Sequence, residues 1–468
     1  MDLEHRHPLY KANIDDWHFF SASYHGGSHY RAPELGMLRK YLFEDDAPGN
    51  QYANRVEYTA MDNLVKLTVD TYRSYLFKTK PVRTFGNLAD DLMINRFLTD
   101  CDFNGQDLND FMKEANDLAT VYGNVWILVT KGAVEGVITR EQEIAADVRP
   151  YARIFTPENV CDWSYEKQPN GSEELTMVKT KEWAGEDKIR YIEWTKETFV
   201  TYVYDVESET VEEYEEVENA IGKVPFVCLV ANRSQYKGVG HSDMADVAKI
   251  QQSIFNLLSE AEQGIRISNH PTLVKTEGTQ AMAGAGSVIT MDDNTDSNLK
   301  PYLIEPNGTN IQAIRDMIEV HVQAFLRSTH LGAVMAERGF SAKSGIALQT
   351  EFEMLNTRLG DKAAKMEQAE WNVWQLFWEW SGLDADPDFN VEYKKSFDLR
   401  DEHADVSLYS KALSMGIESP EYIKQLQKQI AKVVITDGDK LDDIMQEISE
   451  GSTTPEFGAN LDGDTTTD

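Results

Sequence analysis

The sequence predicts an α+β protein in which a mixed region of helices and strands is followed by long helices. Three observations predict this class. Residues 150–230 contain short runs rich in β-branched and aromatic residues. Two segments with helical apolar spacing, 242–270 and 309–328, flank a glycine-containing insert, and residues 345–382 keep the same spacing without a break. Strands and long helices therefore occupy separate stretches of the chain.

The region before the strands is predicted to be mostly helical. The first 50 residues, aromatic and polar with glycine and proline turns, predict only loops and short helices. Residues 54–77 have near-helical apolar spacing, and Pro81 ends that helix. A second helix is expected at about 108–120. The stretch NVWILVT that follows it has the composition of a buried strand.

The strands predicted between residues 150 and 230 are short and separated by turn residues, which suggests an antiparallel sheet. They are YARIFTP, LTMVKTKEW, KIRYIEWT, ETFVTYVYDV and PFVCLV. The stretch 205–218 contains eight carboxylates and no basic residue. Runs of like charge are usually solvated, so we interpret this stretch as a hairpin tip or loop.

The helix, insert and second helix between residues 242 and 329 have recognisable ends. Ser242 can cap the first helix, Asp243 and Asp246 suit its positive end, and Pro271 closes it. The insert, 271–308, combines strand-like runs with flexible, glycine-containing and polar turns. Thr309 and Gln312 fit a capping box that opens the second helix. The two helices are expected to pack against each other, with the insert at their tip.

The last helices follow a segment without periodicity. Residues 330–344 contain glycines and are predicted to be a loop. The helix after it is predicted to be about 55 Å long at 1.5 Å per residue, with a bend at Gly360. A shorter helix is expected at about 401–415. Ser419 and Pro420 restart a helix, and the polar, acidic stretch from 451 onward is expected to be disordered.

Composition limits the classes of function. The chain has 468 residues, 41% of them hydrophobic, which is typical of globular proteins. Its formal net charge of -34 argues against a protein that grips nucleic-acid phosphates tightly, although not against one past which nucleic acid slides. Three separated cysteines give no zinc or disulfide pattern and indicate a reduced setting. We find no signal peptide and no apolar run that could cross a bilayer, so we expect a soluble protein.

Motifs for catalysis and cofactors are not found. No phosphate-binding, nucleophile-elbow, metalloprotease or kinase signature occurs, and no cofactor or metal is expected. The aspartates at 292–296 and at 384–388 are interpreted as polar turns, and weak calcium binding at the second is left open. Five histidines within residues 5–29 lack accompanying ligands at metal-binding spacing. Trp371, Trp374 and Trp378 form a stripe that suits a protein core or a subunit interface equally well.

Several segments, in order, resemble the portal proteins of tailed bacteriophages, the rings at the capsid vertex through which DNA enters. The segments that carry the resemblance are YLFKTKPV, YGNVWILV, GKVPFVCLVANR, IQQSIFNLLSEAEQGIRISNHPTLV, FSAKSGIALQTEFEMLNTRLGDKAAKMEQAEWNVWQLF and GIESPEYIKQL. They cover about residues 55–435, and the pattern SG-x-AL from Ser344 is the most recognisable. The first 50 residues and the acidic tail are not covered.

The resemblance implies a portal fold with a wing of helices and sheet, a two-helix stem, a small α/β clip, a long spine helix and a helical crown. The implied parts are the wing (1–241), stem helix 1 (242–270), the clip (271–308), stem helix 2 (309–329), the tunnel loop (330–344), the spine and linker (345–397), the crown (398–450) and the tail (451–468). Residues implied to contact DNA lie in the tunnel loop: Arg338, Ser341, Lys343 and Ser344. Lys275 and Lys300 of the clip are implied to dock the terminase or the adaptor.

The resemblance also implies partners, and it implies a chain that is not an enzyme. Portals are ring homo-oligomers, typically of twelve subunits, in the virion and, during assembly, in the host cytoplasm. Double-stranded DNA passes through them. The implied protein partners are the terminase large subunit, the head-tail adaptor, and the major capsid and scaffolding proteins, with no membrane. Two alternatives stay open: another ring-forming head-completion or tail protein, and an acidic hydrolase, which no catalytic spacing favours.

Overall fold

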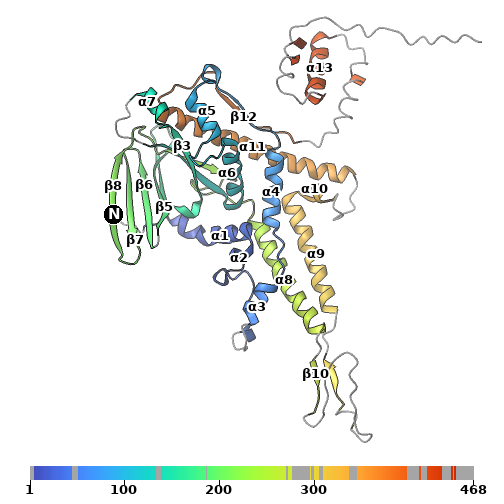
Figure 1. Ribbon diagram of the computed structural model, residues 1–468. Helices are drawn as coiled ribbons and strands as arrows, with labels where there is room; N and C mark the ends of the chain where they lie inside the picture. Colours follow the sequence, from blue (N-terminus) through green and yellow to red (C-terminus); the bar gives the residue numbers. More distant parts are fainter. Residues whose placement is uncertain are drawn as a thin grey trace, which may run out of the picture. The chain divides into compact units, whose positions relative to one another are not determined.

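The structure, a computed structural model, forms two units, Met1–Phe397 and Asp398–Asp468. The residues that it describes are 5–44, 51–132, 139–185, 187–269, 272–276, 296, 300–304, 309–336, 345–397, 411–412, 419–434, 444–445 and 447–448. The first unit combines helices with four antiparallel sheets or strand pairs in its described part (Figure 1). The predicted α+β class is confirmed.

The N-terminal region is more helical than the sequence predicted. Its helices are α1 (Pro8–His25), α2 (Gly27–Tyr30), α3 (Gln51–Tyr58), α4 (Leu64–Leu76), α5 (Leu92–Thr99) and α6 (Leu108–Tyr122), with one-turn 3₁₀ helices at Pro33–Leu35, Leu42–Glu44 and Gly86–Leu88. The prediction of loops and short helices at the start was wrong, because α1 has 18 residues. Its buried side chains Tyr10, Trp17 and Phe20 are seven and three residues apart, which fits a helix, so the helical period was present in the sequence and was overlooked.

The helix predicted over residues 54–77 is two helices in the structure. Residues 59–63 separate α3 from α4, and Asn63 starts α4 by accepting a hydrogen bond from the Lys66 backbone N–H at 2.8 Å. The helix predicted at 108–120 is confirmed as α6. Asp107 caps it in the same way, with its carboxylate 2.8 Å from the Asp110 N–H.

The strands form two separate sheets rather than the one that the sequence suggested. The strands are β2 (Asn124–Lys131), β3 (Pro150–Phe155), β4 (Val160–Lys167), β5 (Glu173–Gly185), β6 (Lys188–Thr195), β7 (Thr198–Asp205), β8 (Thr210–Glu218) and β9 (Phe226–Val230), with helix α7 (Arg140–Ala145) and a 3₁₀ turn at Pro157–Asn159 between them. One sheet has the order β3-β2-β9 and the other the order β4-β5-β6-β7-β8. Strand β2 is buried as predicted, since it is central in its sheet and α6 and α11 pack against it.

Two of these strands were not predicted. The polar alternation of Val160–Lys167 was missed. The acidic stretch at 205–218, interpreted from sequence as a hairpin tip or loop, is mostly the edge strand β8. Its exposed position explains the error, because an edge strand tolerates charges that a central strand would exclude.

Helix α11 (Gly345–Ser381) is the predicted long helix, and its 37 residues confirm the expected length of about 55 Å. Trp374 and Trp378 are buried and stacked, with ring centroids 5.4 Å apart, and Phe97 and Phe377 pack around them. These two tryptophans therefore belong to the core rather than to a subunit interface, whereas Trp371 is exposed.

A small strand pair lies beside α11: β1 (Val82–Thr84) pairs with β12 (Asn390–Glu392). Glu370 of α11 is fully buried and accepts hydrogen bonds from Arg83 Nη2 at 3.0 Å and from the Tyr393 hydroxyl at 2.6 Å. The segment after β12 also accounts for the glycine at position 360 of α11. A Cβ there would lie 2.9 Å from the Lys395 carbonyl oxygen, which is too close for a larger residue.

The second unit contains helix α13 (Pro420–Val434). Ser419 begins it as predicted: its carbonyl accepts from the Ile423 N–H at 3.1 Å, and its hydroxyl lies 3.4 Å from the Tyr422 N–H. The helix predicted at 401–415 and the tail from 451 lie outside the described residues, apart from 411–412.

Candidate functional site

Two long antiparallel helices of the first unit form a pair. Helix α8 (Ala245–Asn269) and helix α9 (Thr309–Thr329) lie side by side in Figure 1 and contact each other along their length. Gly264 near the end of α8 faces Ile311 near the start of α9, with 3.5 Å between its Cβ position and the isoleucine side chain. The helix pair predicted from the apolar stripes is therefore confirmed.

The ends of the two helices differ slightly from the prediction. Helix α8 begins at Ala245, although the Ser242 hydroxyl still accepts from the Met244 N–H at 2.9 Å. Helix α9 begins at Thr309, so Thr309 belongs to the helix rather than preceding it. The Gln312 amide donates to Asp316 at 2.7 Å, one turn further on.

A short strand pair connects the helices at their far end. Strand β10 (Thr272–Val274) pairs with β11 (Tyr302–Ile304), and Val274 is opposite Tyr302. Lys275 follows the last residue of β10, Lys300 lies two residues before β11, and both are exposed. The structure therefore brings the two predicted docking residues to the same end of the insert, whose remaining residues are mostly outside the described part.

The predicted loop after α9 begins with a helix instead. Helix α10 (Gly332–Ala336) follows directly on α9, because Leu331 and Met335 are buried and hold this turn against the core. The prediction of an irregular segment from residue 330 was therefore wrong over these residues. Arg338, Ser341, Lys343 and Ser344, the predicted DNA-contacting residues, lie outside the described residues.

Helix α9 has an exposed apolar stripe. Ala313, Met317 and Val320 lie three or four residues apart, and all three are exposed; Met317 and Val320 keep 49% and 58% of their accessible surface. Apolar side chains aligned on one face of a helix are typical of a surface that another element covers. The described residues of the first unit leave these side chains exposed.

A buried charge cluster joins this helix pair to α11. Asp243, two residues before the start of α8, has a side chain only 4% exposed. Its carboxylate accepts from Arg358 Nη2 at 2.9 Å and lies 2.5 Å from Lys362 Nζ, and both cations belong to α11. Asn232 donates to the same carboxylate at 2.8 Å. A buried carboxylate with this many donors is a fixed point at which several elements meet.

The cations of the cluster reach two further elements. Lys362 donates to the Thr120 hydroxyl of α6 at 2.8 Å, and Arg358 donates to the Ser328 carbonyl near the end of α9 at 3.1 Å. Tyr72 of α4 donates to the neighbouring Thr329 carbonyl at 2.7 Å. Both helices of the pair are therefore attached at one place, α8 through its start and α9 through its end. We call Asp243, Arg358 and Lys362 the junction cluster.

The electrostatics of the junction cluster are strongly coupled. Burial by itself would raise the pKa of Asp243, but Lys362 and Arg358 outweigh it and hold that pKa well below its usual range. Burial lowers the pKa of Lys362, against the opposing effect of Asp243. The carboxylate is thus ionised at every physiological pH, and it compensates the buried ammonium.

Sequence reasoning missed this cluster except for Asp243, which it assigned only to the helix end. The available signal was Arg358 and Lys362 on the otherwise apolar face of the long helix, one turn apart and flanked by the buried Leu355 and Leu359. Cations on a core-facing stripe predict a buried carboxylate partner. They do not say where in the chain that partner lies.

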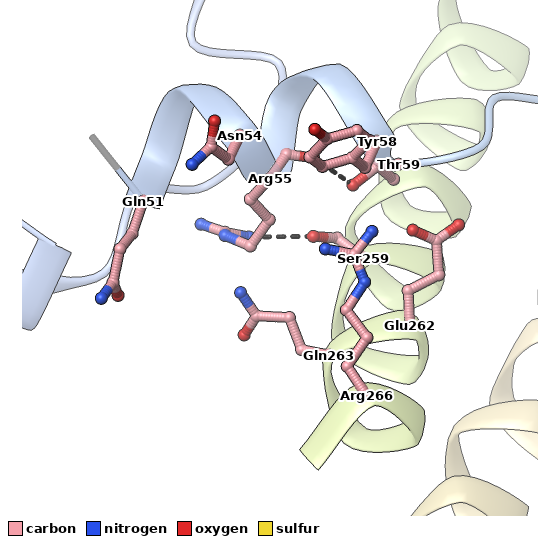
Figure 2. A pocket seen from close by; sticks show the side chains of 9 residues that line it. All are labelled: Gln51, Asn54, Arg55, Tyr58, Thr59, Ser259, Glu262, Gln263 and Arg266. Atoms are coloured by element: carbon pink, nitrogen blue, oxygen red, sulfur yellow. Dashed lines mark hydrogen bonds between the residues drawn. The ribbon is translucent and has the colours of Figure 1, made fainter. Parts of the chain in front are cut away.

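A polar cavity of about 240 Å³ between α3 and α8 adds a second attachment (Figure 2). Arg55 spans it: Nη1 donates to the Ser259 hydroxyl at 3.1 Å, and Nε donates to the buried Glu44 at 2.9 Å. The Arg266 guanidinium lies over the Tyr58 ring, 4.8 Å from its centroid. These side chains form hydrogen bonds and a cation–π contact with one another. The contacts between Arg55 and Ser259 and between Arg266 and Tyr58 hold α3 against α8, and we see no catalytic arrangement among the lining residues.

The other candidate sites within the described residues have ordinary structural roles, whereas the turn predicted at 292–296 lies outside them apart from Asp296. His5 pairs with Asp162 at 3.0 Å, and His7 caps α1 and stacks on Trp163. Asp386 accepts from the Asn87 and Asp388 N–H groups, as a turn residue does. In the part of the chain that the structure describes, no group of three or more histidine, cysteine or acidic side chains is arranged to hold a metal ion, and no helix there is long and apolar enough to cross a membrane.

A family described as "Phage portal protein, SPP1 Gp6-like" matches residues 30–451. The chain belongs to this portal family. The match covers most of the chain, including the α8–α9 pair, the insert and α11, and extends further toward the N-terminus than the resemblance seen in the sequence. No curated protein matches the chain.

Three solved structures with similar folds all come from gene transfer agent (GTA) particles, each at 8% sequence identity. The neck of the empty particle, computed with C6 symmetry, has a TM-score of 0.48 and the match covers 81% of this chain and 94% of that one. The virion of the native particle has a TM-score of 0.41, and the match again covers 81% of this chain and 94% of that one. The neck of the native particle, computed with C12 symmetry, gives 0.44 and covers 78% and 89%.

Proposed function

We propose that this protein is the portal subunit of a tailed phage, and that copies of it close into a ring through which double-stranded DNA is packaged and later ejected. The observation that carries the proposal is the family match over residues 30–451. The fold is consistent with it: a helix pair with a small insert at its tip and a long helix at its base. In this assignment α8 and α9 are the stem, residues 271–308 the clip and α11 the spine.

The exposed stripe on α9 is the feature that a ring would cover. A subunit of a cyclic ring presents two different surfaces, one to each neighbour, and an apolar surface gains stability when the next copy buries it. Met317 and Val320 have this character in the isolated subunit. We therefore place a contact between copies along the stem, with twelve copies as the expected number.

The negative charge fits a conduit. Each phosphate that a protein neutralises releases counterions and adds to affinity, so a channel lined with cations would hold DNA and slow it. A formal charge of -34 on each copy, repeated around a ring, gives a wall that repels the duplex. ATP hydrolysis would then belong to the terminase, which we place at the clip beside Lys275 and Lys300.

Electron microscopy of the purified protein tests the assignment directly. We expect top views with a central hole wide enough for duplex DNA, and a particle mass of twelve times 53.1 kDa. A different ring number would correct only the stoichiometry. A single copy under all conditions, without any higher assembly, would contradict the proposed function.

Arg338 and Lys343 are proposed to make transient phosphate contacts in the channel. The variant Arg338→Gln/Lys343→Gln should form rings but change the amount of DNA that is packaged or retained. A matched control removes two charges elsewhere, at the exposed Lys11 and Lys167. Normal packaging by the first variant, or the same defect in the control, would remove this role from the two residues.

A further inference from the structure

The five-stranded sheet β4–β8 has two different faces. Residues directly opposite each other on neighbouring strands lie on the same face of a sheet. Trp163, Val178 and Trp194 are opposite one another in turn, and all three are buried in the main core. This inner face packs on the rest of the first unit. The other face carries the residues that alternate with them.

Two cross-strand rows lie side by side on that other face, and all their members except Lys181 are aromatic or apolar. The first row is Trp183, Ile189, Tyr204 and Val211, and the second is Lys181, Tyr191, Tyr202 and Tyr214. Trp183 at the β5 end is 78% exposed, and Tyr214 and Val211 at the β8 end are 60% and 47% exposed. Lys181, at the β5 end of the second row, is half-buried and donates to the Tyr10 hydroxyl of α1 at 2.9 Å. We call these two rows the aromatic patch. Exposed aromatic groups on one flat face are typical of an interaction surface.

One residue of the chain, Arg6, already binds to this patch and shows that the patch accepts a guanidinium group. Arg6 covers Tyr191, the buried member of the second row, with its guanidinium 5.3 Å from the ring centroid. Its Nη2 atom also donates to the Tyr191 hydroxyl at 2.9 Å. The next two rings of the row, Tyr202 and Tyr214, have centroids 5.4 Å apart. Tyr202 and Tyr214 therefore extend the same aromatic surface toward β8, beyond the ring on which Arg6 already lies.

The charge around the patch favours the same chemistry. Glu215, Glu216 and Glu218 of the edge strand β8 are exposed, and the whole stretch 205–218 contains no lysine or arginine. Glu216 shares the outer face with Tyr214 and accepts its hydroxyl at 2.8 Å. These carboxylates repel nucleic acid, and they repel the identical edge strand of a second copy. They attract a cationic segment.

We propose that the aromatic patch is a docking surface for a cationic, arginine-containing segment of another protein. Arginine side chains of that segment stack on Tyr214 and Tyr202 and pair with the carboxylates of β8, while an apolar side chain covers Trp183. The unpaired edge of β8 offers backbone donors and acceptors to a segment bound in an extended conformation. This surface is distinct from the stem stripe that we assign to contacts between copies.

Peptide binding to the full-length protein tests the proposal. The probe is a fluorescein-labelled peptide of arginine, leucine and serine, and its counterpart has glutamate in place of arginine. We expect the arginine peptide to bind, measured by fluorescence anisotropy. The variant Trp183→Ser/Tyr214→Ser should weaken it at least about tenfold, and Glu216→Lys/Glu218→Lys should weaken it and reduce its salt dependence.

A matched control removes the same two residue types from exposed positions outside the patch, Trp371→Ser/Tyr236→Ser. It should bind the peptide as the wild type does. Equal affinity for the two peptides, or equal losses in the patch and control variants, would overturn the proposal. A patch variant that no longer assembles would also overturn it, because a second copy would then be the occupant. If a patch variant binds the peptide normally, this inference is contradicted. If the same variant still forms rings, the proposed function is unaffected.

Discussion

Asp243→Asn is the perturbation that most directly tests how the stem is attached. The asparagine keeps the shape of the side chain and removes its charge, which leaves Lys362 buried without a counterion. Removing one partner of a buried ion pair typically destabilises a protein by about 3–5 kcal/mol. Arg358 is less affected, because its side chain keeps 26% of its exposure and can reach water. We therefore expect most of the loss to come from the uncompensated lysine.

Chemical unfolding followed by circular dichroism and tryptophan fluorescence measures the effect. The matched control is Glu379→Gln, also on α11, which removes an ion pair with the exposed Lys223 and should cost less than about 1 kcal/mol. The double variant Asp243→Asn/Lys362→Met should recover much of the stability lost by Asp243→Asn, since no buried charge remains unpaired. Equal losses for Asp243→Asn and the control, or strict additivity in the double variant, would refute the reasoning.

Three further predictions concern the core, a turn and a titration. Trp374→Ala should cost about 3–5 kcal/mol in unfolding free energy, because the indole is fully buried among aromatic rings, whereas a loss near zero would exclude it from the core. Gly123→Ala should lower the melting temperature, because φ is 96° and the new Cβ would lie 2.5 Å from the Gly240 carbonyl oxygen, while the same change at Gly171, with open space around it, should cost less; the opposite order would contradict this. Burial raises the pKa of Asp117 to about 6, although Arg73 opposes this. The folded protein therefore holds the Asp117 proton more tightly than the unfolded chain does, and the stability that this proton contributes is fully present below about pH 4 and is lost as the pH rises through 6. Asp117→Asn should flatten the pH dependence of unfolding over that interval, and an unchanged profile would show that another group titrates there.

The elements that the sequence predicted best are those with a strong local period. Helices α8, α9 and α11 repeat apolar residues at spacings of three and four over many turns, so their existence follows from the chain itself. Helix α1 was missed although Tyr10, Trp17 and Phe20 keep helical spacing, because the residues between Tyr10 and Trp17 are mostly polar and charged. The break between α3 and α4 was missed because the apolar spacing continues on both sides of Asn63.

The sheets show the limit of local patterns. Alternation predicts that a segment is a strand but does not say with which strand it pairs. The five predicted strands therefore read as one sheet, while the structure divides them between the orders β3-β2-β9 and β4-β5-β6-β7-β8. Strand β8 was not predicted because its carboxylates outnumber its valines and tyrosine, and because Val211, Tyr214 and Val217 lie three residues apart and do not alternate.

The sequence by itself determined the class of fold, the order of stem helix, insert, stem helix and long helix, and the strongly negative charge. These properties depend on residue types and on spacings within a few turns of chain, where side chains are neighbours whatever the rest of the molecule does. The tertiary structure alone decided the junction cluster and the aromatic patch. Asp243 meets Arg358 from 115 residues away, and Trp183 joins Val211 only through the pairing of four strands. Contacts over such separations depend on which surfaces exclude water together, and no local spacing records that.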